Sequence, residues 1–388
     1  MSCRNKNEMS SHFLFEKSIA AGRIGELATR NRAIKTPFFM PDATRASVRG
    51  VSREDLETSG IGAVVVNTYH LMLQPGADFM REAGGAHRFM RWDGPVLSDS
   101  GGYQVYSLIH RNPEMGRITE EGAEFRSVLD GSKHMLTPER AIAIQFDLGV
   151  DMMVCLDDPR PNDVSEEEME ASVERTIRWA KRCREEYDRQ VSERGLDDAS
   201  RPLLFGVVQG GKDIGLRKRC AKGLSDIGFD GYGFGGRHMD ADGMFLEEVI
   251  RETAAAIPEN VPRFALGIGT PEDILRCWKL GWDMFDCVIP TREGRHGRLF
   301  VYKKPMTDGW DRMAEAEDFY ETINIGNEQY KEDFASVDED CGCELCRSYT
   351  KAYLRHLFRV EDPLAGRLAS IHNLRFYSRL MESLRVKE

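Results

Sequence analysis

Between about Ile34 and Phe300 the chain repeats one pattern: a short apolar run, a polar or glycine-rich turn, and then a stretch with helical spacing of apolar residues. The apolar runs are nearly uninterrupted, which is typical of strands buried on both faces. Strands that alternate with helices in this way predict an α/β fold with a parallel sheet. The runs are Gly62–Asn67, Pro95–Asp99, Asp151–Asp157, Leu203–Gln209, Tyr232–Gly236, Phe264–Gly269 and Met284–Pro290.

Helix starts are also encoded in the sequence. Ser165 and Glu168 form a capping-box pair, which predicts a long amphipathic helix that runs to about Ser192. Thr270 followed by Pro271 predicts a second helix start, because proline in the first turn loses no helical hydrogen bond. Two more helical patterns, 349–359 and 364–384, lie near the C-terminus.

A parallel sheet of this kind is either an open doubly wound sheet or a closed barrel. No Gly-x-Gly-x-x-Gly follows the first strand, so the sequence does not support a dinucleotide-binding fold. Polar residues instead stand at the ends of many predicted strands, as in a (β/α)₈ TIM barrel, where they form the site. We therefore expect a catalytic barrel over residues 12–300 and an appended zinc-binding subdomain over 301–388. The strand-end residues are Asn67, Asp99, Asp157, Gln209, Gly236 and Asp286.

Composition limits the function classes. The chain has 388 residues, of which 41% are hydrophobic and 30% charged, and no apolar run approaches the roughly 18 residues of a membrane span. The segment Met1–Ser11 is polar and lacks an apolar signal core, so we expect a cytoplasmic protein. The net charge of -11 argues against a general nucleic-acid coat, so any RNA contact requires a local basic patch.

Three of the nine cysteines are clustered as Cys341-x-Cys343-x-x-Cys346, and the other six are scattered. Three thiolates in one tight turn, completed by a histidine, suit a tetrahedral zinc ion (Zn²⁺). From spacing alone the fourth ligand is His372 or His356. A site with four protein ligands is closed to water, so the expected zinc is structural.

Acidic residues at the strand ends are the candidate catalytic groups. Asp99 is followed by Ser-Gly-Gly and then Tyr103, so a flat ring can approach the backbone and stack on the tyrosine. Asp286 lies in an otherwise apolar run, where an unpaired charge is costly unless it has a function. The pair Asp157-Asp158 fits either a site or a solvated turn.

A basic segment, 291–298, follows Asp286 directly. It holds three arginines and a histidine in a glycine-containing stretch, which suits contact with a phosphate backbone. A solvated loop is the alternative interpretation.

Taken together, these motifs resemble the tRNA-guanine transglycosylase family from about Phe13 to Leu384. No single motif is specific, but the set is. The matching segments are 67–73 (NTYHLML), 99–104 (DSGGYQ), 206–210 (GVVQG), 229–232 (FDGY) with Gly235-Gly236, 267–271 (GIGTP), 284–292 (MFDCVIPTR), and the cysteine cluster with His372-Asn373-Leu374.

The resemblance implies an exchange of guanine at the wobble position of tRNA for a free 7-deazaguanine base, either queuine or a pre-queuosine base. It implies Asp286 as the nucleophile that forms a covalent enzyme–RNA intermediate, and Asp99 as the general acid and base. It further implies a homodimer with no membrane association. The remaining roles it assigns are base binding by Asp157, Gln209, the Gly236 amide and Asn67, a ring sandwich of Tyr103 and Leu266, RNA contacts by Arg292 and Arg295, and zinc ligation by Cys341, Cys343, Cys346 and His372.

The sequence departs from the bacterial family pattern in four places. Arg237-His238-Met239-Asp240 replaces a Leu-(Ala/Ser)-Val-Gly-Glu run, and Asp158-Pro159 replaces Glu-Cys, which leaves the identity of the incoming base open. An acidic segment at about Asp308–Glu321 and the end of the sequence at Glu388, without a basic extension, leave the mode of RNA binding open.

Three other interpretations compete with tRNA base exchange. The first is a non-catalytic partner subunit, against which the presence of both Asp99 and Asp286 argues. The second is a related transglycosylase that acts on DNA, for which the acidic composition leaves room. The third is a zinc-braced barrel hydrolase, but no histidine-rich set of catalytic ligands stands at the strand ends.

Overall fold

The computed structural model describes residues 12–16, 22–303 and 318–385. The polar N-terminal segment Met1–Ser11 and most of the acidic segment predicted around Asp308–Glu321 lie outside the described residues. Within the described part, no helix is long and apolar enough to cross a membrane.

Eight parallel strands form the centre of the molecule and follow one another in chain order around the sheet. A bridge between Asp42 and Val65, with the Ala43 amide donating to the Val65 carbonyl at 2.6 Å, links the first strand to the second and closes the ring. The predicted (β/α)₈ barrel is therefore confirmed. The strands are β4 (Phe38–Pro41), β5 (Val64–Asn67), β6 (Val96–Asp99), β10 (Met152–Val154), β11 (Leu203–Val208), β12 (Gly231–Phe234), β13 (Arg263–Ala265) and β14 (Met284–Cys287).

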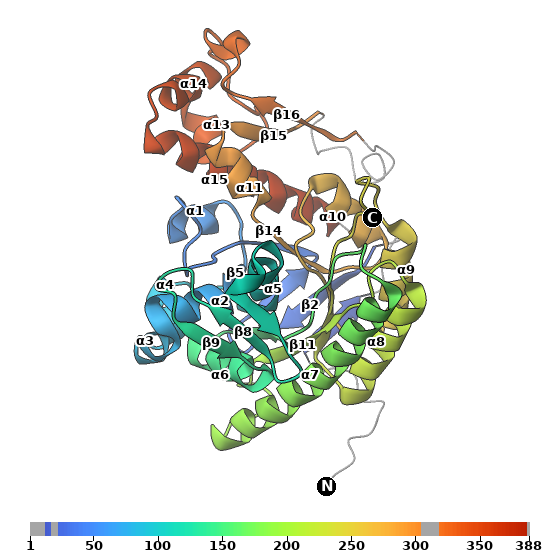
Figure 1. Ribbon diagram of the computed structural model, residues 1–388. Coiled ribbons are helices and arrows are strands. Elements are labelled where there is room, and N and C mark those ends of the chain that lie inside the picture. The colour runs from blue at the N-terminus through green and yellow to red at the C-terminus, as the bar shows by residue number, and fades with distance from the viewer. Residues whose placement is uncertain (1–11, 17–21, 304–317, 386–388) are drawn as a thin grey trace.

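Helices surround these strands on the outside (Figure 1). Both predicted helix starts are confirmed: the Ser165 side chain accepts a hydrogen bond from the Glu168 amide, and the Thr270 side chain accepts one from the Asp273 amide. The barrel helices are α1 (Arg53–Thr58), α2 (Thr68–Leu71), η1 (Met72–Gly76), α3 (Ala77–Glu82), α4 (Gly85–Met90), α5 (Gly102–Arg111), η2 (Pro113–Met115), α6 (Pro138–Leu148), α7 (Glu166–Glu193), α8 (Ile214–Ile227), α9 (Glu247–Ala256), α10 (Pro271–Lys279) and α11 (Ile289–Arg295).

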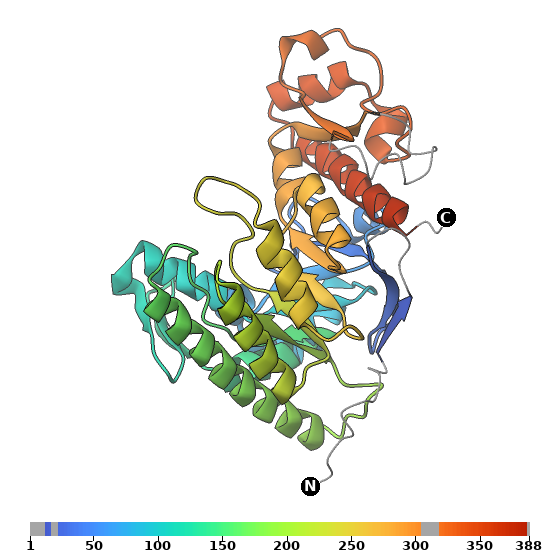
Figure 2. The same cartoon turned by 90° about the vertical axis from the view of Figure 1, so that its right-hand side faces the viewer.

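Two small antiparallel sheets are added to the barrel. The sheet of β1 (Phe13–Glu16), β2 (Ile24–Ala28) and β3 (Ala33–Thr36) lies at one edge in the rotated view of Figure 2. The sheet of β7 (Gly116–Ile118), β8 (Ala123–Arg126) and β9 (Lys133–Leu136) is inserted between α5 and α6. Neither sheet contributes any of the residues that the sequence predicts for the site.

Side chains fill the inside of the barrel. A buried cluster that includes Met40, Leu97, Phe205, Phe264 and Met284 occupies the interior, and a larger cluster packs between the strands and the helices. Because the interior is packed and not an open pore, the residues available for chemistry are those at the carboxyl ends of the strands.

A C-terminal subdomain packs on one end of the barrel (Figures 1 and 2). Its long last helix is buried over much of its length and contacts α11, and Arg367 on that helix forms ion pairs with Asp55 of α1 and with Glu344. The strand β15 starts just before residue 300, and the predicted division at 300/301 stays a prediction. The elements are β15 (Arg298–Tyr302), β16 (Tyr320–Asn324), η4 (Glu328–Tyr330), α13 (Glu344–Ser348), α14 (Lys351–Arg359) and α15 (Pro363–Leu384).

Candidate active site and metal centre

Asp99 ends β6 beside Asn67 of β5, and the two residues are direct partners in the sheet register. The Asn67 Nδ2 donates to Asp99 Oδ2 at 2.5 Å, and the Gln104 Nε2 donates to the same oxygen at 3.3 Å. The amides of Thr68 and Gly101 donate to Oδ1 at 3.3 and 3.1 Å. These donors hold the carboxylate in one orientation, and the residue as a whole is only partly buried.

Glycine is required at position 101 of this loop. Gly101 has a φ of +79°, and a Cβ there would lie 2.9 Å from the Tyr69 backbone nitrogen. The adjacent glycine, Gly102, opens α5 and packs closely against the Asp157 carbonyl and Leu156. The two glycines therefore let the loop after Asp99 turn tightly against α2 and the segment after β10. The predicted close approach of a flat ring to this backbone stays a prediction.

Asp286 lies near the end of β14, which pairs with the closing strand β4 on the side away from β5, and its Oδ1 accepts a hydrogen bond from the Gly267 amide at 2.7 Å. Burial raises the pKa of Asp286 well above its ordinary value, and the charges of Asp42 and Asp99 raise it further. Burial likewise raises the pKa of Asp99 to about 7, against the lowering effect of its hydrogen bonds. The two predicted catalytic acids thus interact electrostatically, although Asp99 and Asp286 lie far apart in the sequence.

Asp42 is a third carboxylate in the same place, and sequence reasoning missed it. It follows β4, whose apolar run Phe38–Pro41 was not recognised as a strand because it is short and directly follows Thr36-Pro37. Burial raises the pKa of Asp42 to about 6, and the nearby Arg292 opposes that shift. Since like charges disfavour one another, three adjacent carboxylates do not all carry a full negative charge at neutral pH.

The predicted base-binding residues come from three neighbouring strands. Asp157 follows β10, Gln209 follows β11 and Gly236 follows β12, and these strands are adjacent in the barrel. Gln209 Nε2 donates to Asp157 Oδ2 at 2.7 Å, and burial raises the pKa of Asp157 to about 6. A Cβ on Gly235 would lie 2.4 Å from Gln209 Nε2, so glycine at that position leaves room for the glutamine.

The predicted ring sandwich lies on the same rim. Tyr103 is in the first turn of α5 and its side chain is 61% exposed, which leaves its ring free to stack. Leu266 follows β13, is partly buried, and packs over Gly233. That the two side chains enclose a base between them stays a prediction.

Asp158 does not belong to this pocket. Its side chain is buried, pairs with Arg175 at 2.5 Å and with Arg160 at 3.2 Å, and so faces away from Asp157. The Asp157-Asp158 pair is therefore not a solvated turn. Asp157 lies in the predicted pocket, and Asp158 holds the segment after β10 against α7 through its ion pair with Arg175.

The loop after Gly236 departs from the family pattern and has its own internal contacts. His238 Nε2 lies 3.3 Å from Asp273 Oδ2, and Asn162 Nδ2 donates to the carbonyls of Arg237 and Met239 at 3.1 and 3.0 Å. Arg237 itself is exposed. Asp240 accepts hydrogen bonds from amides of its own loop. The cationic side chain of Arg237 is thus directed to solvent, while His238 has an acidic partner.

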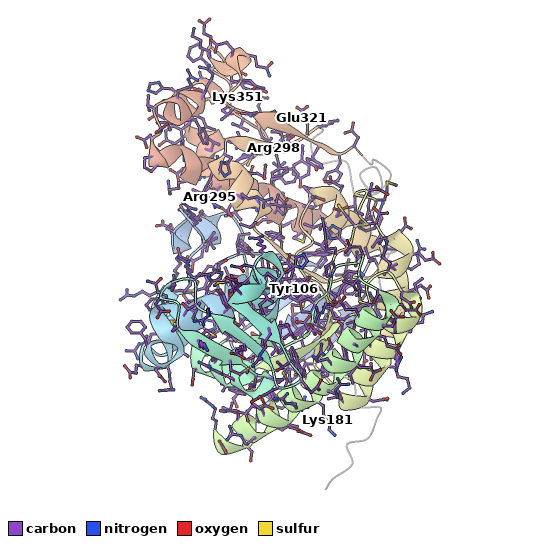
Figure 3. All side chains as sticks on the ribbon, in the orientation of Figure 1. Tyr106, Lys181, Arg295, Arg298, Glu321 and Lys351 are labelled. Carbon is purple, nitrogen blue, oxygen red and sulfur yellow. The ribbon has the colours of Figure 1, made fainter. Side chains whose placement is uncertain are left out.

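Arginines border the site on the side of the C-terminal subdomain. Arg292 and Arg295 lie on α11, and Figure 3 shows Arg295 where the barrel meets that subdomain. Burial lowers the pKa of Arg295, and the charges of Arg49 and Arg292 lower it further, so the three cations lie near one another. Arg49, from the segment after β4, is a second residue that sequence reasoning missed. These three arginines form a local basic patch. That the patch contacts RNA stays a prediction.

The four predicted zinc ligands lie together in a cluster that could hold a metal ion. The sulfur atoms of Cys341, Cys343 and Cys346 and a ring nitrogen of His372 all lie within 4.8 Å of one another. His372 Nδ1 lies 3.2 Å from Cys346 Sγ, while its Nε2 is 2.8 Å from the Phe300 carbonyl. That carbonyl accepts a hydrogen bond from Nε2 and leaves the Nδ1 lone pair for a metal, an arrangement common to ligating histidines.

His356, the alternative fourth ligand, is not part of the cluster. It lies on α14, where the nearest ring contact is Tyr353 at 6.5 Å. Three thiolates and one imidazole with no fifth donor among the described residues fit a closed, tetrahedral zinc site.

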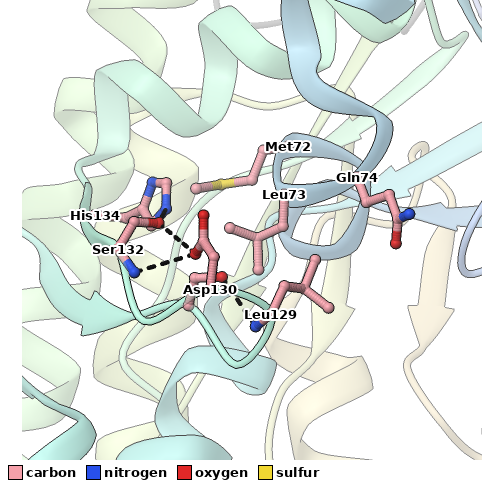
Figure 4. Close-up of a pocket in the computed structure, with 8 residues that line it drawn as sticks. Met72, Leu73, Gln74, Leu129, Asp130, Ser132 and His134 are labelled. Carbon is pink, nitrogen blue, oxygen red and sulfur yellow. Dashed lines mark hydrogen bonds between the residues drawn. The ribbon is translucent and has the colours of Figure 1, made fainter.

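A separate cavity of about 310 Å³ lies beside the β8–β9 turn and carries none of the predicted site residues (Figure 4). Its polar side chains satisfy one another: the Ser132 amide and hydroxyl both donate to Asp130, at 3.1 and 2.7 Å. These hydrogen bonds lower the pKa of Asp130 to about 2. The cavity is therefore not a second cluster of unpaired catalytic groups.

The fold and the site define a (β/α)₈-barrel enzyme with acids gathered at the strand ends and a C-terminal Cys₃His metal centre. The family described as queuine tRNA-ribosyltransferase matches residues 18–387 of the chain. The chain belongs to this family and is a tRNA-guanine transglycosylase, a transferase of tRNA modification.

Curated proteins called queuine tRNA-ribosyltransferase are similar over nearly the whole chain. One from Desulforamulus reducens is 40% identical over 94% of this chain and 90% of its own length. One from Halothermothrix orenii is 40% identical over 97% and 93%, and one from Tolumonas auensis is 40% identical over 96% and 92%.

Proposed function

We propose that this enzyme exchanges guanine at the wobble position of tRNA for a free 7-deazaguanine base through a covalent aspartyl-ribosyl intermediate. The observation that carries the proposal is the pair Asp99 and Asp286, two partly buried carboxylates at one rim of the barrel whose charges interact. They lie on the rim that also holds the Asp157–Gln209 hydrogen bond and the Gly236 backbone.

In the first half of the reaction, a carboxylate oxygen of Asp286 attacks C1′ of the ribose. The bond from C1′ to the guanine nitrogen breaks, its electron pair goes to the base, and Asp99 supplies a proton to the departing guanine. A pKa of about 7 keeps a large fraction of Asp99 in the acid form at neutral pH. A protonated Asp99 also removes one repulsive charge from Asp286, which favours the ionised nucleophile.

In the second half, the free base enters the pocket and Asp99, now a carboxylate, accepts its proton. The base nitrogen attacks C1′ and the bond from C1′ to Asp286 breaks, which restores both carboxyl groups. Asn67 and Gln104 hold Asp99 in place during both transfers. Two acids with separate roles thereby perform one exchange without any net change in the enzyme.

Base recognition would use Asp157, Gln209 and the Gly236 amide on the edge of the ring, with Tyr103 and Leu266 on its faces. For the substituent at position 7, our first choice is queuine and our second the nitrile precursor. The support is the loop after Gly236, where His238 is paired with Asp273 and residues 237–246 contain no glutamate.

Zinc at Cys341, Cys343, Cys346 and His372 would hold the C-terminal subdomain together and contribute folding free energy. Arg292 and Arg295 would contact the phosphates of the tRNA, together with Arg49. We also propose a cytoplasmic homodimer. In support of a dimer, the exposed aromatic side chains Phe79, Phe89 and Tyr353 offer apolar surface for an interface.

The test is an exchange assay with tRNA that carries labelled guanine at the wobble position and three competing bases: queuine, the nitrile precursor and the aminomethyl precursor. We expect release of the label, with queuine preferred. The matched control is Asp286→Asn, which should release none. If wild-type enzyme releases no guanine with any base, the proposed exchange is wrong; a clear preference for the aminomethyl base contradicts only the choice of queuine.

A further inference from the structure

Arg217 of α8 is a charged side chain fully buried beside the predicted base pocket, with a relative exposure of 0%. Its Nε donates to the Gly211 carbonyl at 3.0 Å, and its Nη1 donates to the carbonyls of Val208 and Gly235 at 2.8 and 2.9 Å. One guanidinium thus joins the carboxyl ends of β11 and β12. These are the two strands that lead into Gln209 and Gly236.

The third nitrogen, Nη2, is buried and has no hydrogen-bond partner among residues 12–16, 22–303 and 318–385. Its position is defined by Gly236, since a Cβ on that residue would lie 3.6 Å from Nη2 and 3.6 Å from Gln209 Oε1. Gly236 is itself exposed at the rim. The unpaired N–H groups therefore lie close to Gly236, in the neighbourhood of the two residues that would read the edge of a base.

The charge of Arg217 has no ionic counterpart in the described structure. Burial lowers the pKa of the guanidinium to about 10, so it remains protonated at neutral pH. Removal of such a charge from water is costly, and an apolar side chain of similar volume would fill the space without that cost. The face of the Phe234 ring, 4.0 Å from the guanidinium carbon, and three carbonyls offset part of the cost.

We propose that Arg217 is a positioning residue for base recognition, and that its positive charge behind Gly236 and Gln209 favours bases with an electron-rich 6-oxo group. This inference rests on the proposed function. When the bond between C1′ and guanine breaks, the electron pair moves onto the purine and is delocalised toward its 6-oxo oxygen. A fixed positive charge near that oxygen attracts the partial negative charge that the oxygen already carries in the neutral, bound base, and it attracts the developing anion more strongly.

A structural role for Arg217 and the proposed role make different predictions. If the side chain only holds two strand ends, its loss weakens all bases equally. If it acts through Gly236 and Gln209 on the 6-oxo group, its loss weakens guanine more than 2-aminopurine, which lacks that oxygen. The measured quantity is therefore the ratio of the two inhibition constants against exchange of labelled guanine.

The variants are Arg217→Met, which removes the charge at similar volume, and Arg217→Lys, which keeps it. Arg219→Met is the matched control, because Arg219 lies on the same helix, is exposed and pairs with Glu170 and Glu174. We expect Arg217→Met to weaken guanine about tenfold more than 2-aminopurine, the size of one lost interaction with a charged group. Arg217→Lys should keep the wild-type ratio within about threefold, and Arg219→Met should leave it unchanged.

Equal weakening of the two bases by Arg217→Met overturns the inference. If that variant does not fold, the lysine variant decides, since loss of the guanine preference despite a retained charge also overturns it. Failure of the proposed function is a different result, because wild-type enzyme would then neither release labelled guanine nor be inhibited by either base.

Discussion

The hydrogen bond from Asn67 to Asp99 lowers the pKa of Asp99, so its removal tests the proposed role of Asp99 as the general acid. In Asn67→Ser the shorter side chain no longer reaches Asp99 Oδ2, which Asn67 Nδ2 contacts at 2.5 Å. Serine remains a good helix N-cap, so the bond that Asn67 Oδ1 accepts from the His70 amide at the start of α2 has a replacement. The substitution therefore removes a donor to the carboxylate and spares the helix.

The magnitude follows from the energy of that hydrogen bond. A bond to a charged group contributes about 1.5–3 kcal/mol, and one pKa unit corresponds to about 1.4 kcal/mol. Loss of the bond destabilises the ionised form, so the pKa of Asp99 should rise from about 7 by roughly one to two units. The acid form, which the first half-reaction needs, then persists to higher pH.

The assay is the rate of guanine release and covalent adduct formation, measured between pH 5.5 and roughly pH 10 without any incoming base. In wild type the rate should fall about tenfold per pH unit above pH 7. In Asn67→Ser that descending limb should move to higher pH. Asn67→Ala, which also removes the cap, should show the same shift with lower thermal stability. A descending limb that stays in place, or moves to lower pH, refutes the assignment of Asp99 as the acid.

Four further predictions concern other residues. Asp286→Asn should bind tRNA but form no covalent adduct on denaturing gels; RNA trapped on this variant would reassign the nucleophile. Asp42→Asn removes a neighbouring negative charge, so the pKa of Asp286 and that of Asp99 should fall and the optimum for adduct formation should move to lower pH; an unchanged optimum would show that Asp42 is not close enough to act. Purified protein should contain one zinc per chain, and Cys343→Ala should lose both the metal and thermal stability; a metal-free wild type with full stability contradicts this. Arg295→Ala should weaken tRNA binding and reduce the dependence of log K on log salt by about 1, with little change at saturating tRNA; an unchanged salt dependence would remove Arg295 from the RNA surface.

The short barrel strands show which elements the local sequence pattern can predict and which it cannot. Seven of the barrel strands are recognisable as apolar runs, several of them with a polar residue at the end, and the helix starts at Ser165 and Thr270 are visible as capping residues. The first strand, Phe38–Pro41, was missed because four apolar residues beside a proline do not differ from a loop by sequence alone. With it, Asp42 was missed as well.

The sequence by itself determined the barrel, the helix starts and the cysteine cluster, because hydrophobic period, capping and Cys-x-Cys-x-x-Cys spacing depend on residues close together in the chain. It could not choose between His372 and His356 by spacing, nor separate Asp157 from Asp158. Tertiary structure decided both questions. His372, which lies on another helix than His356, is the histidine close to the three cysteine sulfurs, and Asp158 forms ion pairs with two arginines.

Only the closed barrel brings Asp42, Asp99 and Asp286 within electrostatic reach, and only packing places Arg217 behind Gly236. The physical reason is that desolvation and Coulomb interactions depend on distance and burial in space, which separation along the chain does not encode. Residue types at strand ends therefore predict which groups are available for chemistry, whereas the charge that each group carries is set by the neighbours that the fold gives it.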